Sequence, residues 1–170
     1  MQWLILLLLT IITLSIFYQD YKTRSVIWIL FPCIILLGVF YCLYYSHSVR
    51  VLVLNSVFNI CFLLLQFLLL KIIFRFKKII DHKIGTGDIF FILCCCPFFS
   101  PIYFLSFYIL SLIFCLSSHF LFRRFSKGYN IKTIPLAGLQ SIFLFVFIGI
   151  HTLINTSTIN DDLIISLING

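Results

Sequence analysis

The chain has 170 residues, of which 62% are hydrophobic and only 10% are charged, and its mean hydropathy is +1.18. Soluble domains carry far more charge, roughly a quarter of their residues, so these values exclude an ordinary soluble domain. The net charge of +7 does not require nucleic acid as a partner. Membrane proteins collect Lys and Arg in cytoplasmic loops that face anionic lipid, and we expect the lipid bilayer to be the partner here.

Apolar runs of about 20 residues indicate membrane-spanning helices, and polar loops separate several such runs in this chain. The first run lacks the basic start and the cleavage site of a removed signal peptide. Pro97 and Pro101 favour a break between residues 88 and 122, so we expect two helices there. The predicted fold is an all-α membrane bundle of six helices in one domain, with spans at residues 2–18, 26–45, 51–74, 88–97, 102–122 and 134–154.

The positive charges favour six spans and fix their orientation. All Lys and Arg residues except Arg50 lie in or beside the first, third and fifth loops. The positive-inside rule therefore predicts that these loops are cytoplasmic and that both termini are outside, together with Asp161 and Asp162. A single span over residues 88–122 would instead leave the basic residues that follow it on the outer side.

In this topology two of the five acidic residues, Asp20 and Asp88, meet at the cytoplasmic boundary of the bilayer. Asp20 is expected in the polar loop after the first span, and Asp88 directly precedes the fourth. Two adjacent carboxylates can share a proton, because like charges at short range resist double ionisation. The ionised group can take a proton from water and the protonated group can donate one, which is the chemistry of aspartic peptidases. This chemistry needs no metal and no cofactor.

Two glycines, Gly85 and Gly87, come immediately before Asp88. Glycine permits close backbone approach, so this segment can bring the main chain against an extended peptide and orient the aspartate. Taken alone, the same residues also fit a glycine-rich turn in which Asp88 caps a helix.

Three stretches carry a resemblance to a known family. They are Asp20-Tyr21-Lys22-Thr23-Arg24-Ser25-Val26, Gly85-Thr86-Gly87-Asp88 and Ile134-Pro135-Leu136. In order and spacing they resemble the motifs of the type IV prepilin peptidases and preflagellin peptidases, which are membrane aspartic proteases of the GxGD kind. The resemblance covers essentially the whole chain, with Ile27 and Phe90 standing where family members often have Pro and Lys.

The resemblance implies that Asp20 and Asp88 form a catalytic dyad, in a short peptidase-only form without the methyltransferase and zinc domain of larger members. It implies prepilin, pseudopilin or preflagellin precursors as partners, cut between a short basic leader and an apolar helix at the cytoplasmic face of a prokaryotic inner membrane. The residues expected to help position the two aspartates are Lys22, Arg24, Lys83 and Pro135. For the three basic residues, contact with lipid headgroups is the alternative role.

The sequence also permits other interpretations of some of these residues. Asp81 is a solvated loop charge or replaces Asp20 as the partner of Asp88. The run Cys94-Cys95-Cys96 reads as small buried hydrophobes, and the absence of a C-x-x-C pair argues against a metal site. The competing class of function is non-enzymatic, either an inactive assembly factor or a small cation-coupled transporter, in which the two aspartates bind a cation or cap helices.

Overall fold

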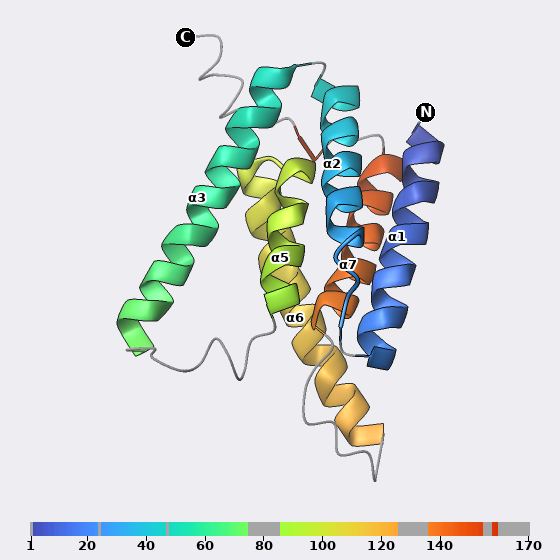
Figure 1. The fold of residues 1–170 in the computed structure, drawn as a ribbon, viewed down its shortest axis with the longest axis vertical. Coiled ribbons are helices and arrows are strands. Elements are labelled where there is room, and N and C mark those ends of the chain that lie inside the picture. The colour runs from blue at the N-terminus through green and yellow to red at the C-terminus, as the bar shows by residue number, and fades with distance from the viewer. Residues whose placement is uncertain are drawn as a thin grey trace.

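The computed structural model describes residues 2–23, 25–46, 48–74, 86–125, 136–154 and 158–159. These residues form a bundle of α-helices with no strand among them (Figure 1). The elements in chain order are α1 (Gln2–Thr23), α2 (Leu30–Ser46), α3 (Val49–Phe74), α5 (Thr86–Cys95), the 3-10 turn η1 (Cys96–Phe98), α6 (Pro101–Phe125) and α7 (Leu136–Leu153). The predicted all-helical architecture is confirmed.

The bundle has the size and surface of a multi-pass membrane protein. Helices α1, α3, α6 and α7 are long and apolar enough to cross a membrane, and α2 and the α5–η1 segment are shorter but also apolar. Large apolar side chains cover the outside, for example Leu7, Phe40 and Leu116. Soluble monomers rarely expose apolar patches beyond a few hundred Å², so this surface is suited to lipid.

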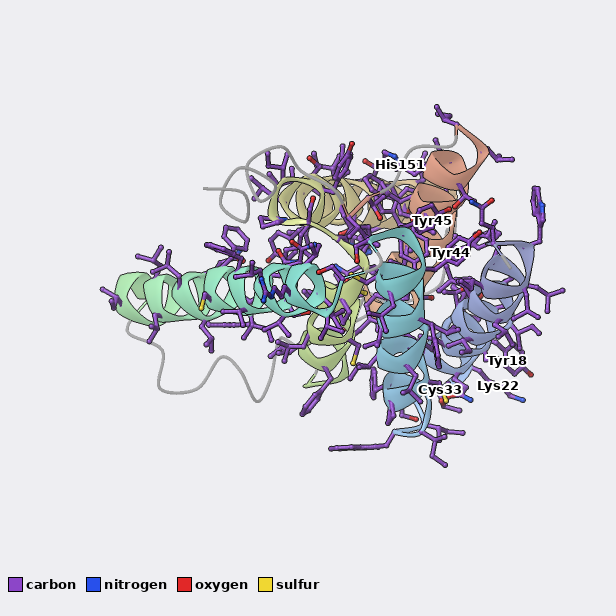
Figure 2. All side chains as sticks on the ribbon, turned by 90° about the horizontal axis from the view of Figure 1, so that it is seen from above. Tyr18, Lys22, Cys33, Tyr44, Tyr45 and His151 are labelled. Carbon is purple, nitrogen blue, oxygen red and sulfur yellow. The ribbon has the colours of Figure 1, made fainter. Side chains whose placement is uncertain are left out.

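Successive helices run in alternate directions, so the ends of the bundle differ (Figure 1). Helices α1, α3 and α6 end, and α2, α5 and α7 begin, at the lower end of this view, whereas the chain starts at the upper end. Helix α7 packs against α1, α5 and α6 in the interior of the bundle. Helix α3 tilts away from the other helices toward its C-terminal end in both views (Figures 1 and 2).

Helix α1 continues past the predicted end at residue 18 to Thr23, so Asp20 lies in its last turn and not in a loop. None of these additional residues breaks a helix, and the basic Lys22 is favourable near a helix C-terminus. The Gln19 side chain then fixes the turn toward α2, because its Oε1 accepts a hydrogen bond of 3.0 Å from the Ile27 amide. Because the helix is longer, Asp20 is held in a helical turn and not in a loop.

Prolines explain two other helix boundaries. Helix α2 begins at Leu30 and not at residue 26, which places Pro32 in its first turn. Helix α6 begins at Pro101 itself. Proline is tolerated in the first turn because the amide that it lacks has no partner within the helix there.

The short helix α5 ends inside the bundle. Its 10 residues span about 15 Å, which is roughly half of the hydrocarbon core of a bilayer. Backbone groups at such a break need partners within the protein, because lipid offers none. Nδ2 of the buried Asn59 on α3 donates to the carbonyls of Cys96 and Phe99, at 3.0 and 2.8 Å.

Thr158 and Ile159, beyond α7, provide further hydrogen bonds at this break. The hydroxyl of Thr158 donates to the Phe98 carbonyl at 2.8 Å, and the Thr158 carbonyl accepts from the Ser100 amide at 2.8 Å. The neighbouring Ile159 carbonyl accepts from Nδ2 of Asn55 at 3.1 Å. Residues from α3 and from beyond α7 therefore satisfy the polar backbone at η1, which holds α5 and its N-terminus in place.

Replacing Asn59 by Leu tests this account of the break. The variant leaves the carbonyls of Cys96 and Phe99 without their donor, and an unsatisfied buried polar group costs about 1–3 kcal/mol. We expect Asn59→Leu to lower the thermal unfolding midpoint in detergent. The control, Ser106→Ala, removes an exposed hydroxyl that bonds only within its own helix, and it should leave the midpoint unchanged. Equal midpoints for the two variants contradict the account.

Candidate active site

The N-terminus of α7 is the point where the two predicted aspartates meet. The amide of Ala137 donates to Oδ1 of Asp88 at 2.8 Å, and the amide of Gly138 donates to Oδ2 of Asp20 at 2.7 Å. The first amides of a helix have no acceptor within that helix. Carboxylates from α1 and α5 fill this role at two consecutive positions of α7.

The two carboxylates occupy one site. Consecutive Cα atoms lie about 3.8 Å apart, and each carboxylate is within hydrogen-bond distance of one of two neighbouring amides. The helix dipole also places partial positive charge at this end, which attracts anionic groups. Asp20 is buried, whereas Asp88 is partly exposed. The arrangement therefore gathers two acids around a positive helix end, with one acid accessible.

A close contact between α1 and α7 makes this geometry possible. A Cβ atom added to Gly138 would lie 3.1 Å from Oδ2 and 3.2 Å from Cβ of Asp20. One turn further along α7, the hydroxyl of Ser141 donates to the Thr13 carbonyl of α1 at 3.0 Å. Small residues and hydroxyl groups at a helix crossing permit this approach in membrane proteins.

The structure places the other predicted residues as follows. Gly87 lies in the first turn of α5, and a Cβ atom added there would meet no described atom within 4 Å. Lys22 lies on the outer side of α1 (Figure 2), where its ammonium group donates to the Tyr18 hydroxyl at 3.3 Å. The positions Arg24, Asp81, Lys83, Gly85 and Pro135 lie outside the described residues.

The cysteine run belongs to the core of the bundle. Cys94, Cys95 and Cys96 are all buried, at the end of α5 and the start of η1. Within the described parts of the chain, no three His, Cys or Asp side chains are grouped closely enough to hold a metal ion.

Sequence reasoning missed three contributors to this site. The amides of Ala137 and Gly138 carry no side-chain signal, although the proline just before α7 marks a helix start with free amides. Gln140 is fully buried on α7, one turn from Ala137. None of these residue types stands out within an apolar run.

Comparisons with protein-family models, with curated proteins and with solved structures find no match for this chain. Two carboxylates held together can bind one water molecule, share a proton and exchange it with a bound substrate. The same pair can also cap α7 without performing any reaction. The geometry alone therefore defines a candidate acid–base site.

Two alanine substitutions in α7 test the close approach at Gly138. Alanine in place of glycine favours a helix by about 0.5–1 kcal/mol, and Gly149, with open space around its added Cβ, should show this gain. Gly138→Ala should instead lose about 1–3 kcal/mol relative to Gly149→Ala, because Asp20 or the α1 backbone has to move. Thermal unfolding of both variants in detergent measures the difference. Equal stabilisation by both substitutions rules out the tight contact.

Proposed function

We propose that this protein is a membrane aspartic endopeptidase that removes the short basic leader from type IV prepilin-like, pseudopilin or preflagellin precursors. The observation that carries the proposal is the pair Asp20 and Asp88, held on consecutive amides of α7. The aspartates come from the two stretches that resemble the motifs of the prepilin and preflagellin peptidases. The Ile134-Pro135-Leu136 stretch, the third point of resemblance, directly precedes these amides.

The proposed orientation has six spans, with the active site at the cytoplasmic face of a prokaryotic inner membrane. It is supported by the alternating helix directions, since both aspartates lie at the end where α1 ends and α5 and α7 begin (Figure 1). The connections at this end carry nearly all of the basic residues of the sequence, as the positive-inside rule requires of cytoplasmic loops. Anionic lipid at that face would also attract a basic leader.

In the proposed mechanism the two aspartates share one proton and bind a water molecule between them. The ionised carboxylate takes a proton from the water as its oxygen adds to the scissile carbonyl carbon, and the protonated carboxyl donates to the carbonyl oxygen. The carbon–nitrogen bond of the resulting tetrahedral intermediate then breaks. The leaving nitrogen receives a proton from the dyad, and the new carboxyl group retains the oxygen of the water. The pair titrates as a unit, so neither residue is assigned as the acid.

Conservative substitutions at the two aspartates test the proposal. Asp20→Asn and Asp88→Asn keep an oxygen acceptor for the α7 amides but cannot exchange a proton, so each should abolish processing while the protein remains folded. The measurement is the size of a co-expressed prepilin-like precursor on a gel. Asp81→Asn and Asp162→Asn are the controls, and both should process like the wild type.

The outcomes separate the alternatives. Processing that survives in both Asp20→Asn and Asp88→Asn contradicts a catalytic role for the two aspartates. They would then be helix caps or cation ligands in a non-enzymatic protein. Loss of processing in Asp81→Asn and Asp88→Asn, but not in Asp20→Asn, moves the second acid to Asp81.

Gly87 provides a second, independent test. No described side chain or backbone requires a glycine at this position, because an added Cβ meets nothing within 4 Å. In the proposal, the extended substrate occupies this open side of α5 next to Asp88. We therefore expect Gly87→Ala to keep or raise the thermal midpoint, because alanine favours helix, and to slow precursor cleavage. Unchanged cleavage by this variant would place the substrate elsewhere.

A further inference from the structure

The side chain of Gln140 on α7 is buried without a hydrogen-bond partner. It is 0% exposed, and neither its Nε2 nor its Oε1 atom bonds to any of the described residues. Burying an amide without a partner is costly, since the groups lose their bonds to water and gain none. Two other residues, Asn55 and Ser100, also have an unpartnered side-chain atom, but each makes another hydrogen bond at the η1 break. Gln140 differs because both polar atoms are unused.

The position of Gln140 directs its side chain toward the aspartates. Residues three apart on a helix share a face, and Ala137, three positions earlier, holds Asp88. Phe143, three positions later, makes tilted ring contacts with Phe107 and Phe114 of α6. Long side chains on a helix lean toward its N-terminus and cover the preceding turn. From this spacing we expect the carboxamide of Gln140 near the level of Ala137, on the side of α7 that faces α5 and α6.

We propose that Gln140 binds the main-chain peptide group of the substrate next to the aspartate pair. A carboxamide has a donor and an acceptor side by side, and a peptide bond presents the complementary carbonyl and amide groups. With substrate bound, Nε2 donates to a substrate carbonyl oxygen and Oε1 accepts from a substrate amide. Both unused atoms are then satisfied, and the extended main chain is positioned for attack by water held at Asp20 and Asp88.

This inference rests on the proposed peptidase function and names the group that binds the substrate backbone. It also explains why a buried, unsatisfied amide is retained at this depth. Sites that bind a ligand commonly sacrifice stability of the free protein for function. A residue kept for folding alone would instead have its partners within the protein.

The test compares Gln140→Met with a matched control, Gln66→Met. Met has a shape similar to Gln but no hydrogen-bonding amide. Gln66 donates to the Tyr108 hydroxyl at 2.9 Å between α3 and α6, so the control removes an amide that has a partner within the protein. The purified full-length proteins are given a synthetic peptide that joins a short Lys- and Arg-rich leader to an apolar helix. Cleavage kinetics and the thermal midpoint in detergent are measured for each.

For Gln140→Met we expect kcat/KM to fall roughly 10- to 100-fold, the effect of losing hydrogen bonds to a buried partner, while the thermal midpoint is unchanged or raised. Gln66→Met should show the reverse, with a lower midpoint and cleavage within about twofold of the wild type. Cleavage by Gln140→Met within twofold of the wild type overturns the inference. So does a drop in its midpoint like that of Gln66→Met, because this result assigns Gln140 a structural role.

Asp20→Asn, measured on the same peptide, separates failure of this inference from failure of the proposed function. If Asp20→Asn is inactive and Gln140→Met cleaves normally, only the role of Gln140 is wrong. If Asp20→Asn cleaves as fast as the wild type, or the wild type does not cleave the peptide, the peptidase function fails and the role of Gln140 fails with it.

Discussion

The start of α7 imposes the constraint on which the rest of the bundle depends. Its first amides lie inside the protein and need acceptors, and Asp20 and Asp88 provide them at 2.7 and 2.8 Å. These two bonds join α7 to α1 and α5, which are far apart in the sequence. They also require small residues at the crossing, and Gly138 supplies the space that the carboxylate of Asp20 occupies. The same contacts that position three helices therefore assemble the candidate site.

A second polar region, at the η1 break, has a different character. There the side chains of Asn55, Asn59 and Thr158 bond to backbone carbonyls, so their role is explained by the fold. The close packing of η1 against α2 fits the same role, because a Cβ atom added to Gly38 would lie 2.9 Å from the Phe98 ring. Polar groups at this break stabilise a short α5, and the short α5 in turn sets the position of Asp88.

The sequence was sufficient to predict the helical membrane fold and the meeting of Asp20 with Asp88, because apolar runs, prolines and loop charges are local signals. It was insufficient for the end of α1, where Asp20 was expected in a loop but lies in a helix. The residues of α1 permit the longer helix, and the hydrogen bond that holds Asp20 against α7 joins residues that are distant in the chain. The roles of Ala137, Gly138 and Gln140 could not be predicted, because backbone amides and a single glutamine in an apolar run leave no pattern.

The unequal burial of the two aspartates indicates how a substrate would reach them. Asp20 is enclosed between α1 and α7, where Gly138 leaves no room for another group. Asp88 is partly exposed, and a Cβ atom added to the neighbouring Gly87 would meet no described atom within 4 Å. In the proposed function, a peptide would therefore arrive along α5 and meet Asp88 first. Gln140 is fully buried one turn further along α7 than Ala137, the residue whose amide binds Asp88. In the proposed function, a group in that position would bind the peptide and would not serve only to support the acids.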